Sequence, residues 1–389
     1  MAKIEEFMAN DLDATLNYYV RNGFRPNSFY YNCSSIEDPF AIGQKRPILG
    51  IYFMTVGTLI LSVYLPCLFV ISRSDLMKSS CYKIMLYLGV MDTCCLTVNS
   101  LITGFLGFIG ATFCSYPRFI YLAGAIGVGC WMGSCSTCIL LAINRCSDIN
   151  HNLPFRKMFI GRNVYFTMLI PVFYTIYAVF FTKPIIFNSN YMSWFFNPNL
   201  GLNVRKLKVE IDKNLYFQSD YYVNFPHTVN NCCVSLCTTS LYGYLSLLIH
   251  YKSKHSQSET LSKTQKQVSA SEKERIQQKF QIFTQSVLIC SCNAVAAYIY
   301  VYMQFFYSPP AIILLGQIAW QCAHASVCVV YITWNKSVRR KVIDLLVPEA
   351  IKLRMKGRVG STNTARRMMS IAGGDLLKGA TTTNSGTVF

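Results

Sequence analysis

Charged residues are scarce in this chain of 389 residues. Asp, Glu, Lys and Arg make up 14% of it, whereas a soluble globular domain has roughly 25%. Acidic residues are half as numerous as basic ones, 18 against 36, while hydrophobic residues reach 52%. This composition is typical of a protein that crosses the membrane many times and argues against a soluble chain of two or three domains.

The sequence also lacks the patterns that carry most enzyme chemistry. It has no Gly-rich phosphate loop and no nucleophile paired with a base. Among its 17 cysteines no Cys/His spacing is typical of zinc. We therefore expect no enzymatic activity, no cofactor and no metal site.

Seven apolar runs are long enough to cross a bilayer, which takes about 20 residues of helix. They lie at about 48–71, 83–106, 118–146, 164–181, 229–250, 280–306 and 311–334. The third run carries Ala125, Gly129 and Gly133 four residues apart. Small residues on one helical face let a neighbouring helix approach closely. The sequence predicts an all-α membrane protein, a bundle of seven transmembrane helices.

Basic residues are distributed unequally between the segments that connect the runs. The segments on one side hold 24 Lys and Arg, and those on the other side hold 10. The richer side is expected to be cytosolic, although Lys45 and Arg46 flank the first run on the poorer side. The N-terminus is then outside and the C-terminus in the cytosol. Because topology accounts for the basic residues, we expect contact with a lipid bilayer and none with nucleic acid.

This orientation divides the chain into four parts. Residues 1–46 form an extracellular tail, and residues 47–334 form the seven-helix bundle. Residues 335–347 are expected to form an amphipathic helix along the membrane surface, since their apolar side chains share one face. Residues 348–389, rich in Ser, Thr and Gly, are expected to be a disordered cytosolic tail.

Two charged residues stand out within the apolar runs. Asp92 is the only carboxylate inside any of them, and its charge should face the bundle interior beside a partner. His324 and Ser326 in the seventh run are the candidate partners. A switch or ion site and a structural hydrogen-bonded pair explain Asp92 equally well. Arg145, at the cytosolic end of the third run, is by itself best explained as an anchor for lipid phosphates.

Few cysteines lie where oxidation is expected. Cys33 lies in the outer tail and Cys114 just before the third run, and oxidising conditions outside the cell favour pairing. Cys33–Cys114 is the preferred pair, Cys232 or Cys233 is a competing partner for Cys114, and free thiols are the third possibility. The tail also carries an acceptor sequence for an N-linked glycan at Asn32.

Polar residues in the outer thirds of four runs are candidates for a ligand pocket, because pocket walls are mostly apolar with a few polar groups. They are Tyr121, Asn231, Tyr302 and Gln317. Each could equally form a hydrogen bond between helices. The outer loop 182–228 is unusually long, and its aromatic first half could form part of a lid.

Short motifs in a fixed order carry a family resemblance. They are Tyr31-Asn32-Cys33, Tyr64-Leu65-Pro66-Cys67, Cys81-Tyr82-Lys83-Ile84-Met85, Asp92, Phe113-Cys114-Ser115-Tyr116-Pro117, Leu140-Leu141-Ala142-Ile143-Asn144-Arg145-Cys146, Ser193-Trp194-Phe195-Phe196-Asn197-Pro198 and the segment from Tyr331 to Asn335. Over about residues 31–346 the chain resembles G-protein-coupled receptors, and most closely the nematode serpentine chemoreceptors of class T.

The resemblance implies a chemosensory receptor that binds an external small-molecule cue and signals to a heterotrimeric G protein. It implies residence in the plasma or ciliary membrane of sensory neurons. It also implies that Asn144, Arg145 and Tyr331 belong to the switch that faces the G protein. The alternative is a multi-pass transporter or channel without G-protein coupling, which would usually show internal repeats or several intramembrane charges.

The chain departs from the rhodopsin-like pattern at several positions. Asn144 takes the place of the usual acidic residue, and Val327-Cys328 takes the place of the Asn-Pro pair before Tyr331. The outer loop lacks its usual cysteine, and Cys114 lies 31 residues before Arg145, which is more than the rhodopsin-like spacing. These departures concern the details of the switch.

Overall fold

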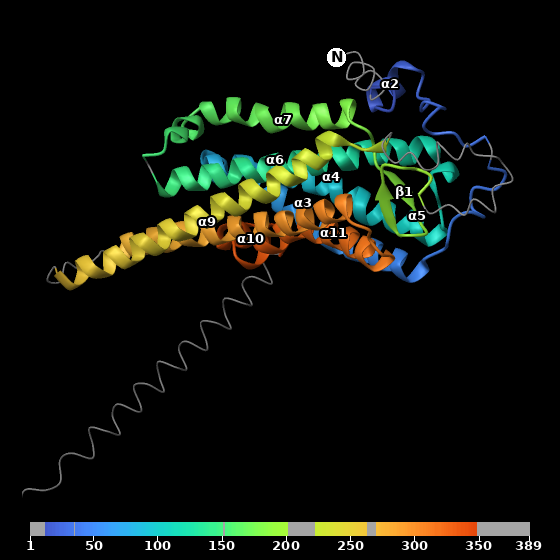
Figure 1. Cartoon of the computed structure of the whole chain (residues 1–389). Coiled ribbons are helices and arrows are strands. Elements are labelled where there is room, and N and C mark those ends of the chain that lie inside the picture. Colours follow the sequence, from blue (N-terminus) through green and yellow to red (C-terminus); the bar gives the residue numbers. More distant parts are fainter. Residues whose placement is uncertain (1–11, 35, 151, 201–221, 263–269, 348–389) are drawn as a thin grey trace, which may run out of the picture. The chain divides into compact units, whose positions relative to one another are not determined.

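Long helices dominate the computed structural model, which describes residues 12–34, 36–150, 152–200, 222–262 and 270–347 (Figure 1). Within these residues, seven helical stretches occupy the predicted runs. They are α3 (Pro47–Ser72), α4 (Ser80–Leu96) continued by α5 (Thr103–Ile109), α6 (Pro117–Ile149), α7 (Asn163–Phe181), α9 (Phe225–Ser262), α10 (Ala270–Phe305) and α11 (Pro310–Thr333). The predicted helical membrane bundle is confirmed.

Six of these stretches are long and apolar enough to cross a membrane, counted over the described residues. The stretch outside that set is α9. Between α4 and α5 the second run passes through a π-helical turn, η2 (Thr97–Ile102), in which Asn99 and Ser100 are buried. The extra residue of a π turn rotates the side chains that follow it.

Shorter elements connect and flank the bundle. They are α2 (Leu16–Arg21), η1 (Asp75–Lys78), η3 (Phe113–Ser115), η4 (Pro154–Phe159), β1 (Ile186–Asn188), β2 (Ser193–Phe195) and α12 (Lys336–Leu346). β1 and β2 form an antiparallel hairpin in which Phe187 pairs with Trp194. The chain divides into two compact units between Arg339 and Arg340. The placement of residues 335–347 along a membrane stays a prediction, and residues 348–389 lie outside the described part.

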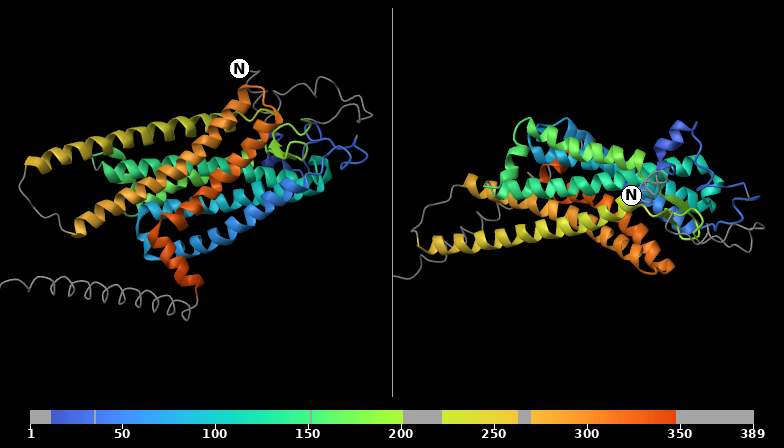
Figure 2. Two further views of the ribbon diagram at one scale, coloured as in Figure 1. Left: turned by 90° about the horizontal axis from the view of Figure 1, so that it is seen from below. Right: turned by 45° about the horizontal axis from the view of Figure 1, so that its top comes forward.

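α6 is the central helix of the bundle. In the most apolar segment of α6, 78% of the residues are buried, whereas the corresponding share for α7 is 28%. α6 packs against α4, α7, α9 and α10 (Figures 1 and 2). The predicted close approach is present on its small-residue face. Gly129 lies against Val179 and Gly133 against Thr175, both on α7. A long uncharged segment can therefore be surrounded by protein on most sides.

The bundle has two ends that differ in structure. At the disulfide end lie the disulfide Cys33–Cys114 and the β1–β2 hairpin, and at the Arg145 end lies the C-terminal part of α6. The hairpin is held to the bundle by Trp194, whose Nε1 donates to Oγ1 of Thr103 (2.7 Å). Which end faces outward stays a prediction.

We expect Gly129→Ala to destabilise the protein, because an added Cβ would lie 3.0 Å from the Cα of Val179. Overpacking of this kind costs about 1–3 kcal/mol. Gly243→Ala is the matched control, since a Cβ there meets no atom within 4 Å. The midpoint of thermal unfolding in detergent should fall for Gly129→Ala alone. Equal midpoints for the two variants would contradict the close contact between α6 and α7.

Candidate functional site

A buried polar cluster surrounds Asp92 in the middle of the bundle. The Oδ2 of Asp92 accepts from the hydroxyl of Tyr64 (2.7 Å), and Oδ1 accepts from Ser134 (3.1 Å). Nδ1 of His324 lies 2.7 Å from the same Oδ1. Asp92, His324 and Ser134 have no exposed surface. The carboxylate thus gathers groups from α3, α6 and α11 around one point.

The sequence had singled out Asp92 and His324, and the structure brings them together. Ser326, the other candidate partner, donates instead to the carbonyl of Ala323 on its own helix. Tyr64 and Ser134 were not identified from sequence as members of this cluster. Hydroxyl groups are common in membrane helices, and only the rotation of each helix about its axis shows which of them faces the carboxylate.

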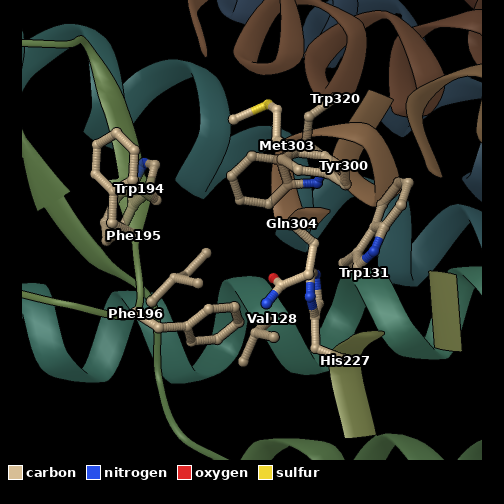
Figure 3. A pocket seen from close by; sticks show the side chains of 11 residues that line it. Val128, Trp131, Trp194, Phe195, Phe196, His227, Tyr300, Met303, Gln304 and Trp320 are labelled. Atoms are coloured by element: carbon tan, nitrogen blue, oxygen red, sulfur yellow. The ribbon is translucent and has the colours of Figure 1, made fainter. Parts of the chain in front are cut away.

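An aromatic cavity lies between the hairpin and the helices. Its volume is about 140 Å³. Its lining comes from α6, the segment around β1 and β2, α9, α10 and α11, and consists of Val128, Trp131, Ile185, Trp194, Phe195, Phe196, His227, Tyr300, Met303, Gln304 and Trp320 (Figure 3). Figure 3 shows the hairpin aromatics on one side and Tyr300, Trp320 and Trp131 on the other.

The residues expected to line the pocket lie outside this lining. Tyr121 is covered by the N-terminal segment, since its hydroxyl donates to the carbonyl of Ala14 (2.9 Å). Gln317 is buried and donates to the carbonyl of Asn99 (3.1 Å). Tyr302 is 46% exposed and stacks on Phe306. None of these three residues lines this cavity, and their contact with a ligand stays a prediction.

Asn231, the fourth of these residues, contacts a residue of the cavity wall. Its Oδ1 accepts from Nε1 of Trp131 (2.9 Å), so it orients a cavity wall without forming one. The aromatic first half of the outer loop does contribute to the cavity, through Trp194, Phe195 and Phe196. This part of the loop therefore supplies aromatic cavity walls, and its role as a lid stays a prediction.

The cavity and the Asp92 cluster share a boundary. Trp320 lines the cavity and donates from Nε1 to Nε2 of His324 (3.0 Å). The ring of Trp131, also in the lining, meets the His324 ring edge-on with centroids 5.7 Å apart. Two residues of the cavity lining, Trp320 and Trp131, thus contact His324 directly.

At the Arg145 end, the guanidinium is held mainly by its own helix. Arg145 is 7% exposed; its Nη1 lies 3.1 Å from Oδ2 of Asp148, and Nη2 donates to Oδ1 of Asn144 (2.6 Å). Asn144 in turn donates to the hydroxyl of Ser80 on α4 (3.1 Å). The Nε of Arg145 is buried without a hydrogen-bond partner among the described residues.

Tyr331 does not touch Arg145 through a hydrogen bond in this structure. Its hydroxyl donates to the carbonyl of Met85 on α4 (3.1 Å), and its ring meets that of Tyr64 with centroids 5.9 Å apart. The predicted switch residues therefore occupy two neighbouring networks. Tyr331 belongs to the network that includes Asp92, because its ring contacts Tyr64, which donates to Asp92.

Asn335 closes a further polar network that sequence reasoning missed. Its Nδ2 lies 3.0 Å from the hydroxyl of Tyr82 on α4 and 3.3 Å from Oε1 of Gln285 on α10. Oδ1 accepts from the backbone of Val338 (3.1 Å), which caps the start of α12. One side chain thus ties α4 and α10 to the end of α11.

The disulfide joins Cys33 to Cys114, with the two Cα atoms 5.5 Å apart. Cys232 and Cys233, the competing partners, are free. The bridge fixes an N-terminal segment whose tyrosines pack on the bundle. Tyr19 stacks on Tyr121, and Tyr222 donates to the carbonyl of Tyr30 (2.9 Å). This segment covers part of the disulfide end.

The environment of this cover keeps its tyrosines protonated. Burial, together with nearby Tyr121, raises the pKa of Tyr31 well above its usual range. Burial likewise raises the pKa of Tyr222 to about 12.

Beside Tyr31, Asn32 is exposed, and its Oδ1 accepts from the backbone and the hydroxyl of Ser34 (2.9 and 2.7 Å).

Comparison with known proteins identifies relatives over most of the chain. The family model described as serpentine type 7TM GPCR chemoreceptor Srt matches residues 14–355. Serpentine receptor class T-55 of Caenorhabditis elegans is 24% identical over 329 residues, which cover 82% of this chain and 81% of that protein. The crystal structure of squid rhodopsin is similar with a TM-score of 0.50 and 13% identity, covering 82% of this chain and 91% of that one. The last similarity concerns the fold.

We expect Cys114→Ser to lower the free energy of unfolding by about 2–5 kcal/mol, because the bridge closes a long loop in the unfolded chain. Cys233→Ser is the control, since Cys233 is free and exposed. The thermal midpoint should fall for Cys114→Ser and stay constant for Cys233→Ser. Mass spectrometry of a non-reduced digest should show Cys33 linked to Cys114, and an unpaired Cys114 would contradict the bridge.

Proposed function

We propose, on the premise that this chain belongs to the serpentine type 7TM GPCR chemoreceptor family Srt, that its ligand binds in the aromatic cavity below the β1–β2 hairpin. The protein is a multi-pass membrane receptor of the G-protein-coupled, chemosensory kind. The observation that carries the assignment is the family match over residues 14–355. The cavity supports the proposal because, among the described residues, it combines aromatic walls with a few polar groups.

The cavity favours a small, uncharged and mainly apolar ligand. Its described lining contains no Asp, Glu, Lys or Arg, and burying a charge without a partner is strongly unfavourable. Polar contacts are available from His227, Gln304 and the hydroxyl of Tyr300. A ligand with one or two hydrogen-bonding groups on an apolar body fits this chemistry.

We place the disulfide end outside the cell and the Arg145 end in the cytosol. The distribution of Lys and Arg between the connecting segments favours this orientation. A disulfide at Cys33–Cys114 supports it, since such bonds persist in oxidising compartments. The family resemblance extends the proposal to the plasma or ciliary membrane of sensory neurons.

The Arg145 end is proposed to contact a heterotrimeric G protein through loops 143–163 and 251–279. In this structure Gln285 of α10 is tied to Asn335 (3.3 Å), and Arg145 is tied to Asp148 and Asn144. Ligand binding would favour a state in which α10 swings outward, a shift between two populations. That movement requires the Gln285–Asn335 hydrogen bond to break and exposes Arg145 to the G protein.

Arg145→Ala should abolish ligand-evoked G-protein signalling while leaving surface expression normal, because it removes the charge that we assign to the switch. The ligand for this assay is selected from a panel of small uncharged compounds in cells that express the native chain. Arg73→Ala is the matched control, since Arg73 is exposed and lies between α3 and α4, outside loops 143–163 and 251–279. Signalling that survives in Arg145→Ala would overturn the assignment of this residue. Solute or ion flux without any G protein would favour a transporter or channel.

Asn32→Gln should remove an N-linked glycan and increase electrophoretic mobility. Treatment of the native protein with peptide N-glycosidase should give the same mobility as the variant. The reason is that the proposed orientation exposes Asn32 to the glycosylation machinery of the secretory pathway. A native protein whose mobility does not respond to the enzyme would count against the outward position of the disulfide end.

A further inference from the structure

We infer that Trp320 transmits the occupancy of the aromatic cavity to the Asp92 cluster, through a neutral His324 that carries its proton on Nδ1. This inference rests on the proposed function in one respect, the use of the cavity as the ligand site. Trp320 is a positioning residue here, because it acts on Asp92 through His324.

The indole of Trp320 belongs to two sites at once. Its ring forms part of the cavity wall (Figure 3). Its Nε1 donates to Nε2 of His324 (3.0 Å), which lies one helical turn further along α11. Trp320 is 3% exposed and His324 is fully buried, so neither side of this hydrogen bond can turn to water instead.

The donor on Trp320 determines which nitrogen of His324 carries a proton. An indole N–H can only donate, so Nε2 of His324 must accept and carries no proton. A neutral imidazole then has its single proton on Nδ1, which lies 2.7 Å from Oδ1 of Asp92. An imidazolium would place two N–H groups against each other at the Trp320 contact. The geometry is therefore that of a neutral ring that donates to the carboxylate.

Asp92 is satisfied by the same arrangement. It accepts from Nδ1 of His324 and the hydroxyl of Ser134 on Oδ1, and from the hydroxyl of Tyr64 on Oδ2. These donors follow one direction from the cavity, because Trp320 donates to His324 and His324 donates to Asp92. Rotation of the indole would leave Nε2 of His324 as a buried acceptor without a partner, which favours rearrangement of the ring.

The far side of the cluster leads toward the Arg145 end. The ring of Tyr64 meets the ring of Tyr331, and the hydroxyl of Tyr331 is bound to the backbone of α4. A change in the position of His324 therefore acts, through Asp92, on a tyrosine pair between the cavity and the proposed G-protein face. A ligand that displaces the Trp320 indole has a connected route to that face.

Two other indoles of the described cavity lining provide internal controls. Trp194 donates to Thr103 (2.7 Å) and Trp131 donates to Asn231 (2.9 Å). Trp194→Phe therefore removes a cavity hydrogen bond of the same kind without touching the donor to His324. Trp320→Phe removes that donor and keeps an aromatic ring in the wall.

The protonation state is tested by nuclear magnetic resonance on the full chain labelled with ¹⁵N-histidine in lipid nanodiscs. The His324 signals are identified by their loss in His324→Gln. We expect one protonated and one bare nitrogen, a shift of the bare-nitrogen signal in Trp320→Phe, and no shift in Trp194→Phe. Two protonated nitrogens in the native protein, or equal responses to the two substitutions, would overturn the inference.

Cavity occupancy is imitated by Val128→Phe, which adds a ring to the lining from α6. The His324 signals should shift in this variant, and the shift should disappear when Trp320→Phe is added. A shift that persists in the double variant would show that Trp320 is not the route. If Val128→Phe fails to fold, the comparison of Trp320→Phe with Trp194→Phe still decides the protonation state and its donor.

Signalling separates this inference from the proposed function. Basal G-protein activity per receptor at the cell surface should change by about tenfold in Trp320→Phe, within the usual range of coupling between sites. Cys233→Ser should stay near the native level, since Cys233 is a free and exposed cysteine. An unchanged Trp320→Phe would overturn the transmission, whereas a native chain with no G-protein activity would contradict the proposed function and leave the histidine spectra to decide the inference.

Discussion

The structure depends on one constraint, the need of the buried Asp92 carboxylate for hydrogen-bond donors. A charge inside an apolar bundle is tolerated only where donors surround it. Here Tyr64, Ser134 and His324 supply them from three different helices. Because each donor must reach the same carboxylate, the rotation of α3, α6 and α11 about their own axes is restricted. The cavity lining contacts this cluster through Trp320, and Tyr331 contacts it through Tyr64.

The cluster connects the two ends of the bundle by shared residues. Toward the disulfide end, Trp320 is both a cavity wall and a donor to His324. Toward the Arg145 end, Tyr64 meets Tyr331. A chemoreceptor must convert binding at one end into a new surface at the other, and a continuous path of buried contacts with directional hydrogen bonds is suited to that conversion.

Parts of the site were predictable because their physical cause is local in the sequence. Asp92 is a lone carboxylate in an apolar run, so its burial beside a partner follows from the cost of an isolated charge. The sequence left two candidate partners in the seventh run, His324 and Ser326, and the structure decides for His324. The cavity was less predictable: polar residues such as Tyr121 and Gln317 are used by the N-terminal segment and by an interhelical bond. Aromatic residues of the hairpin form the wall in their place.

The sequence by itself determined the membrane class, the helical runs and the family, because the length and apolarity of each run are properties of contiguous residues. Only the tertiary structure decided which side chains face the cavity, since successive residues of a helix point about 100° apart and a small rotation exchanges one wall residue for another. It also decided that Trp320 donates to His324 and that Cys33 meets Cys114. Such contacts depend on distances between segments far apart in the chain.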